Sequence, residues 1–179
     1  MPVKSVQDLF VQELRDIYHA ERQITKALPR MAKAASSPEL KQAFEDHLEQ
    51  TRGQIERLDQ VFEQLDLPKR AKKCEAMEGL IEEARSTMEE IEDDGVLDVG
   101  MIINAQKVEH YEIAGYGSLV ALAKQLGHGE AAALLAETLA EEKEADQKLG
   151  QVASGLAKGG EEPATPPPPR RRSAARASA

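Results

Sequence analysis

Residues 105–122, AQKVEHYEIAGYGSLVAL, decide the fold of this chain. Their apolar or small residues recur at roughly helical spacing and predict an amphipathic helix that packs against a core: Ala105, Val108, Ile113, Tyr116 and Val120. Two acids interrupt this face, because Glu109 and Glu112 are three residues apart and lie on one flank of the helix. An unpaired carboxylate inside a core is costly, so these acids require a partner. That partner is a metal ion, or the cation of an arginine or a lysine.

The composition favours a single all-helical domain. Of the 179 residues, 41% are hydrophobic and 31% charged, with three Tyr, three Phe and no Trp. A core poor in aromatic and β-branched residues but rich in Leu, Ala, Glu, Lys and Gln is typical of helices. The net charge of −9 disfavours nucleic acid, except at residues 160–179, which hold four Arg against two Glu.

The sequence also favours a cytoplasmic location without membrane contact. The single cysteine, Cys74, excludes an internal disulfide and fits a reducing compartment. The first residues, MPVKSVQDLF, soon turn polar, and every apolar run is too short for a signal peptide or a membrane span.

Apolar spacing and cap residues predict four long helices and one short helix. The long ones cover about residues 5–35, 36–65, 96–125 and 130–157, and the short one about residues 75–92. A short segment between two helix pairs carries the chain from one end of a bundle to the other. We therefore expect a four-helix bundle with a short crossover helix over residues 1–158. Residues 159–179, rich in Pro and Arg, are expected to form a disordered tail, with a weak contact to nucleic acid or membrane, or a tether to a partner, as alternatives.

Polar residues on the apolar faces of the other helices are candidate metal ligands. The first helix has Glu21, the second has His47, and the last has Glu142 and Asp146 four residues apart. With Glu109 and Glu112 they form a set of oxygen ligands and one imidazole, which suits one or two ions of iron or manganese.

Structural alternatives stand beside this hypothesis. A lone inward histidine such as His47 is more often a hydrogen-bonded core residue than a ligand, and Glu142 belongs to a charged run at residues 141–144 of a kind that is commonly solvated. The Glu-x-x-His pair that dimetal bundles carry on two helices is missing, and the second helix offers Thr51 and Gln54 instead.

Five stretches carry a family resemblance: ELRDIYHAERQITKALPRMAKAA (13–35), HLEQTRGQIERLDQVFEQL (47–65), KCEAMEGLIEE (73–83), VEHYEIAGYGSL (108–119) and LLAETLAEEKEAD (134–146). With these five stretches in this order, the chain resembles the YciE/YciF-type stress proteins over about residues 5–156. Those proteins are bacterial members of the ferritin-like superfamily. The resemblance implies a ferritin-like four-helix bundle with a crossover, often dimeric, and a role in stress responses.

The wider superfamily implies roles for individual residues. Glu21 resembles the first-helix glutamate that binds iron in rubrerythrins, and Glu109 with Glu112 resembles their third-helix E-x-x-E pair. Glu142 matches the last-helix glutamate, whereas Asp146 stands where those proteins carry a histidine. Thr51 and Gln54 occupy the usual Glu and His positions of the second helix.

We therefore expect a cytoplasmic, homodimeric stress protein that binds iron or manganese inside the bundle and oxidises the metal if it reacts at all. Two alternatives remain open. One is a non-enzymatic dimeric interaction module with a hydrogen-bonded polar core, and the other is a DNA-protecting protein that uses the C-terminal Arg tail.

Overall fold

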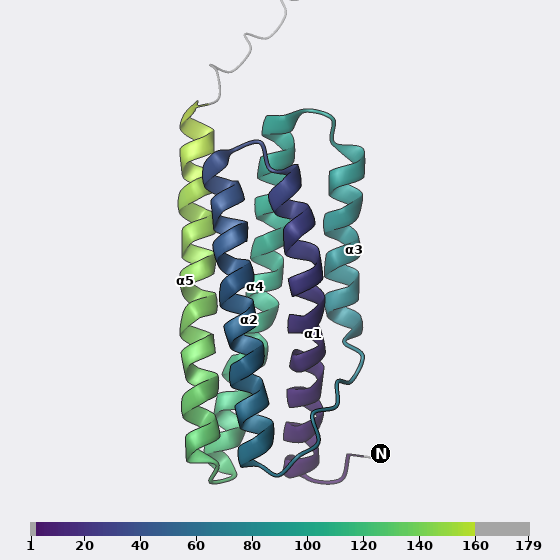
Figure 1. The fold of residues 1–179 in the computed structure, drawn as a ribbon, viewed down its shortest axis with the longest axis vertical. Coiled ribbons are helices and arrows are strands. Elements are labelled where there is room, and N and C mark those ends of the chain that lie inside the picture. The colour runs from purple at the N-terminus through teal and green to yellow at the C-terminus, as the bar shows by residue number, and fades with distance from the viewer. Residues whose placement is uncertain (1–2, 160–179) are drawn as a thin grey trace, which may run out of the picture.

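Five helices make up the computed structural model, which describes residues 3–159 (Figure 1). They are α1 (Val6–Ala34), α2 (Pro38–Gln64), α3 (Glu75–Glu90), α4 (Asp94–Gln125) and α5 (Gly129–Gly159). The all-α class is confirmed, and each bound lies within two residues of the predicted one. Nearly all of the predicted tail lies outside the described residues.

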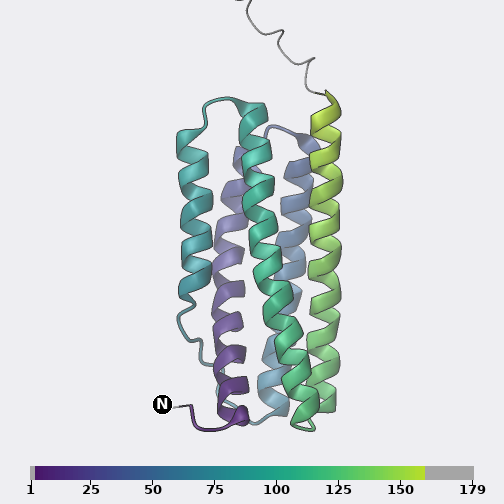
Figure 2. The ribbon, with the colours of Figure 1, turned by 180° about the vertical axis from the view of Figure 1, so that it is seen from behind.

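The four long helices form the bundle, and α3 packs on its side against α1 and α4 (Figures 1 and 2). Helix α2 ends at the same end of the bundle at which α1 begins. Helix α3 carries the chain back to the opposite end, where α4 begins. As a result α2 and α4 run in the same direction. This arrangement confirms the predicted short crossover helix between the second and third long helices.

Polar caps explain where the helices begin. Ser5 Oγ accepts a hydrogen bond from the Asp8 amide at 3.0 Å, and Ser37 Oγ accepts one from the Leu40 amide at 3.3 Å. The turn between α1 and α2 is also fixed from α4. There the buried carboxylate of Asp98 accepts bonds from Ser36 N (2.9 Å), Ser36 Oγ (2.6 Å) and Ser37 N (2.8 Å).

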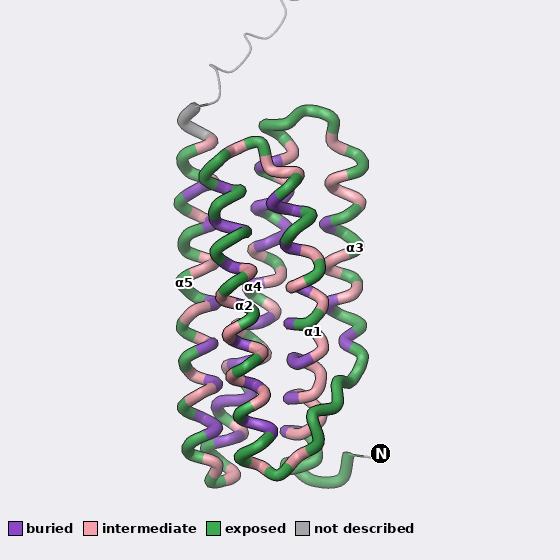
Figure 3. Tube along the Cα trace, in the orientation of Figure 1, coloured by how far each residue is buried: buried purple, intermediate pink, exposed green. Residues whose placement is uncertain are grey.

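The core runs along the inward sides of the long helices, as the buried segments in Figure 3 show. Its large apolar side chains include Phe10, Phe44, Phe62, Met101 and Leu119. The spacing of apolar residues predicts that Leu9 lies on the inward face of α1, but its side chain is 38% exposed, so this prediction is wrong. No helix in residues 3–159 has an apolar stretch long enough to cross a membrane.

Candidate metal centre

Four buried side chains from three helices meet inside the bundle. His47 comes from α2, Glu109 and Glu112 come from α4, and Glu142 comes from α5. One potential ligand atom of each lies within 4.8 Å of those of the other three. The structure therefore brings together four of the six residues that the sequence singled out.

Glu21 of α1 is fully buried beside these four residues. The hydroxyl of Tyr116 donates a hydrogen bond to its Oε1, while its Oε2 has no partner among the described residues. Glu21 lies close to Glu112 and Glu142. In addition to burial, the charge of Glu21 raises the pKa of Glu112, and the charge of Glu142 raises the pKa of Glu21. It thus belongs to the same acid group.

Asp146 lies at the margin of the group: after burial and the nearer acids, its charge also raises the pKa of Glu109, but its side chain does not join the cluster. Its side chain is 24% exposed, accepts a hydrogen bond from Gln106 Nε2 at 3.2 Å, and lies 3.5 Å from Nδ1 of the exposed His110. The four-residue spacing does place Asp146 near the face of α5 that carries Glu142, but at the edge of that face.

The polar atoms of the group are largely unpaired among residues 3–159. Five carboxylate oxygens lack a hydrogen-bond partner: Glu21 Oε2, Glu109 Oε2, both oxygens of Glu112, and Glu142 Oε2. His47 Nε2 lies 3.4 Å from Glu109 Oε1, within ion-pair distance, but makes no well-formed hydrogen bond. Each unpaired buried group costs about 1–3 kcal/mol. With its carboxyl groups ionised, the group is therefore not a closed hydrogen-bond network, whereas protonated carboxyls can pair Glu21 with Glu112 and Glu109 with Glu142.

Burial controls the protonation of these residues. It raises the pKa values of Glu21, Glu109 and Glu112 well above the usual range, and the charge of neighbouring carboxylates raises them further. Burial likewise raises the pKa of Glu142, to about 7. It lowers the pKa of His47, which favours the neutral imidazole that binds metal ions. A cation at this position would displace protons from the carboxyl groups.

Thr51 and Gln54 support the group in other ways. The Thr51 hydroxyl donates to the backbone carbonyl of His47 at 2.7 Å, so it is satisfied within α2. The Gln54 amide donates to Glu142 Oε1 at 2.5 Å and to Glu141 Oε2 at 3.1 Å. Gln54 therefore holds one oxygen of Glu142, while the other oxygen stays unpaired.

Arg57 is a neighbour that the sequence interpretation missed. Its guanidinium binds both oxygens of Glu141, at 2.7 and 3.0 Å, and donates to Thr138 Oγ1 at 2.6 Å. Arg57 thus forms its salt bridge with Glu141 and not with Glu142, although its positive charge opposes part of the rise in the pKa of Glu142 that burial causes. Its position three residues after Gln54, on the same side of α2, was the available signal.

The donor set fits iron or manganese. It consists of carboxylate oxygens and one neutral imidazole, and hard oxygen donors with a histidine suit both ions. Within the described residues, none of Glu21, Glu109, Glu112 and Glu142 forms a salt bridge with a lysine or an arginine. Of the two partners that the sequence left open, a metal ion thus suits these residues better.

Comparison with known proteins places the chain in a family. The family described as a domain of unknown function (DUF892) matches residues 5–160. Protein YciF of Escherichia coli K12 is 53% identical over 154 residues, which cover 86% of this chain and 93% of YciF.

Solved structures agree with this match. The crystal structure of the E. coli stress protein YciF has a TM-score of 0.85 and 52% identity, and the match covers 87% of this chain and 99% of YciF. YcfI from Rhodopseudomonas palustris, named as a candidate structural protein, has a TM-score of 0.83 and 50% identity, with 84% and 96% of the two chains covered.

A more distant structure supports the fold alone. It is a two-domain protein of Anabaena variabilis with DJ-1/ThiJ/PfpI-like and ferritin-like domains, with a TM-score of 0.60 and 19% identity over 91% of this chain and 41% of that one. The predicted resemblance to YciF-type stress proteins is confirmed, and the chain belongs to the DUF892 family.

Proposed function

We propose that this protein binds one or two ions of iron or manganese inside the bundle. His47, Glu109, Glu112 and Glu142 would hold the first ion, and Glu21 supplies a further carboxylate beside them. The observation that carries the proposal is the set of five unpaired, buried carboxylate oxygens that face one another without a lysine or arginine partner in residues 3–159. A divalent cation offsets both their unmet bonding and their mutual repulsion.

An oxidative-stress role fits this site. A bound iron or manganese ion would supply one-electron redox chemistry with oxygen or peroxide. Tyr116, which donates its hydroxyl hydrogen to Glu21, is the candidate electron donor on the protein. Tyr18 of α1 does not share this position, because its ring packs edge-on against Phe62. The relative in E. coli is itself named a stress protein.

We further propose that the protein is a cytoplasmic homodimer. The dimer is supported by an exposed apolar stripe on α4, formed by Val96, Val99 and Ile103, each 43–56% exposed. Their spacing of three and four residues places them on one side of the helix, where a second copy would cover them. A Val99→Lys variant is expected to shift the mass measured by light scattering from dimer to monomer.

Metal analysis tests the main proposal. The full chain, purified without chelator, should contain about one or more equivalents of iron plus manganese by elemental analysis. Less than about a tenth of an equivalent, even after incubation with Fe²⁺ or Mn²⁺ and desalting, would overturn it.

The name of the R. palustris relative favours a second candidate, a structural interaction module whose polar core needs no metal. In that case Glu109→Ala would lower stability by a few kcal/mol, as roughly expected for a disrupted polar core, and leave any metal content unchanged. Under the main proposal the same substitution lowers the metal content.

A further inference from the structure

A cavity of about 250 Å³ lies inside the bundle next to the acid group. His47 and Glu109, two of the candidate ligands, form part of its wall. Most of the remaining wall is apolar, with side chains that include Ile24, Met31, Phe44 and Leu149. The cavity is thus an apolar compartment that ends at the candidate metal centre.

Small side chains create this space. One alanine from each of the five helices lines the cavity: Ala27, Ala43, Ala84, Ala105 and Ala145. Where a leucine at these positions would fill the interior, an alanine leaves room between the helices. Apolar cavities hold water poorly and accept apolar molecules, so the lining of this space favours an apolar ligand.

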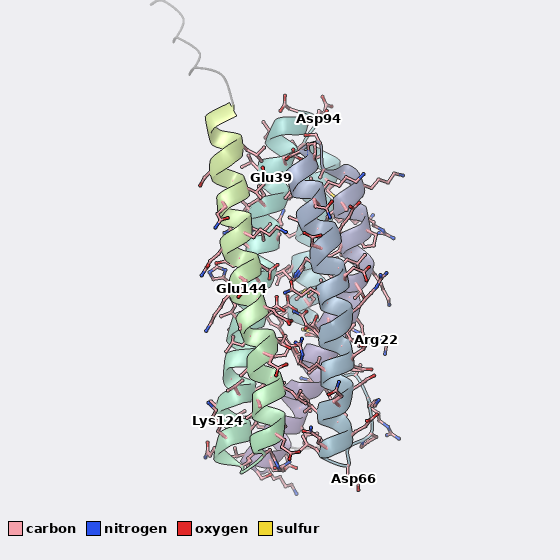
Figure 4. The ribbon with its side chains drawn as sticks, turned by 60° about the vertical axis from the view of Figure 1, so that its left-hand side comes forward. Arg22, Glu39, Asp66, Asp94, Lys124 and Glu144 are labelled. Atoms are coloured by element: carbon pink, nitrogen blue, oxygen red, sulfur yellow. The ribbon has the colours of Figure 1, made fainter. Side chains whose placement is uncertain are left out.

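The opening of the cavity is polar and slightly acidic. Asp46 and Lys148, each about half exposed, form an ion pair of 2.7 Å there and neutralise each other. Glu144, which lies near the middle of α5 (Figure 4), is exposed and adds a negative charge. A ligand with a carboxylate would meet this negative charge at the opening and the acid group at the inner end.

We propose that the cavity binds an uncharged, largely apolar small molecule, with one end against His47 and Glu109. An apolar cavity of about 150 Å³ accommodates benzene, so a cavity of 250 Å³ accommodates about ten non-hydrogen atoms. The occupancy of the cavity does not depend on a metal. The role of the bound molecule as the organic substrate of the centre rests on the proposed function.

Binding of 1-nonanol to the metal-free full chain tests the occupancy. Nuclear magnetic resonance titration should give saturable one-to-one binding, with amide shifts concentrated at residues that line the cavity. Nonanoate, of equal chain length, should bind at least about tenfold more weakly, because its charge is desolvated among acids. No saturable binding, or tighter binding of nonanoate, would overturn the proposal.

Filling the cavity provides the matched control. Ala145→Leu on α5 should weaken 1-nonanol binding by at least about tenfold, whereas Ala136→Leu, half-buried on the same helix but outside the cavity, should leave it unchanged. If Ala145→Leu does not fold, Ala27→Leu on α1 fills the same space from the opposite side. Equal binding by a folded cavity-filling variant and the wild type would contradict the proposal.

Loading the protein with Mn²⁺ distinguishes a failure of the cavity proposal from a failure of the proposed metal function. In protein loaded with Mn²⁺, protons at one end of bound 1-nonanol should broaden more than those at the other end, because that end lies near the paramagnetic ion. Bound Mn²⁺ without such broadening would contradict the placement against His47 and Glu109. Binding of 1-nonanol without any Mn²⁺ uptake would support the occupancy of the cavity while overturning the proposed metal function.

Discussion

The Nε2 atom of His47 lies 3.4 Å from Oε1 of Glu109 and so joins α2 to α4 across the interior of the bundle. Both side chains are buried, and this contact lacks the geometry of a hydrogen bond. A neutral imidazole and a carboxylate at this separation can both donate electron pairs to one cation.

Glu112→Gln should show whether the acid group is a metal site or a structural polar core. When Glu112 is ionised, both of its buried oxygens lack a hydrogen-bond partner among residues 3–159, so the neutral amide should stabilise the metal-free protein by about 1 kcal/mol at pH 8. Metal content should fall by about tenfold, since a ligand is lost. Elemental analysis and urea unfolding measure the two effects, and Glu137→Gln, at a side chain 64% exposed on α5, is the control.

The opposite pair of results would contradict the interpretation of Glu112. If Glu112→Gln retained full metal content and destabilised the metal-free protein at pH 8, the carboxylate would be a structural hydrogen-bond acceptor.

The metal-free protein should be less stable at pH 8 than at pH 5. The pKa of Glu142 rises on folding from 4.5 to about 7, so its contribution is fully present below pH 4.5 and is lost as the pH rises through 7. This single group accounts for about 3 kcal/mol. The pKa values of Glu21, Glu109 and Glu112 shift in the same direction.

His47 acts in the opposite sense. Its lowered pKa contributes stability that is present above pH 6.5 and lost as the pH falls, but it is one group against four. Urea unfolding in the presence of a chelator measures the balance, and saturating Mn²⁺ should reverse the order because the ion displaces the protons. A metal-free protein that gains stability between pH 5 and pH 8 would count against the raised pKa values.

Gln54→Glu should increase metal uptake. The side chain already contacts Glu142 and has an unpaired amide oxygen, so a glutamate there adds a carboxylate beside the site. The metal-free variant should lose about 1–3 kcal/mol at pH 8, because two acids replace an amide–carboxylate hydrogen bond. Equivalents of iron or manganese per chain are the measurement. The control is the exposed Gln60→Glu, and equal uptake by both variants would exclude a second ion next to Gln54.

Asp98→Ala should destabilise the fold by about 3 kcal/mol without changing the metal content per folded chain, since three hydrogen bonds to the α1–α2 turn are lost. Asp94→Ala, at the exposed start of α4, should change stability by less than about 1 kcal/mol. Thermal unfolding measures both. An unchanged melting temperature for Asp98→Ala would show that the turn holds without this contact.

The helices could be predicted from local signals, because each depends on residues that are neighbours in the sequence. Ser5 and Pro38 marked the starts of α1 and α2 within one residue. Burial at the edge of a helical face was harder to predict, since it depends on which helices pack on either side. Leu9 and Asp146 both lie at such edges and are more exposed than expected.

The candidate site was partly predictable for the same reason. The spacing of Glu109 and Glu112 indicated a shared face, and the convergence of Glu142 followed from the bundle. The pairing of Arg57 with Glu141 joins residues 84 positions apart and could not be found by local spacing. The cavity depends on alanines from five helices. That these alanines lie around one space can be seen only once the helices are packed together.

The crossover divides the chain into two helical hairpins, and each holds only a share of the ligands. The α1–α2 hairpin carries Glu21 and His47, and the α4–α5 hairpin carries Glu109, Glu112 and Glu142. A bound ion would therefore link the two hairpins, because it would take ligands from both. The availability of metal would then govern how firmly the two halves of the molecule stay docked, in addition to any chemistry between them.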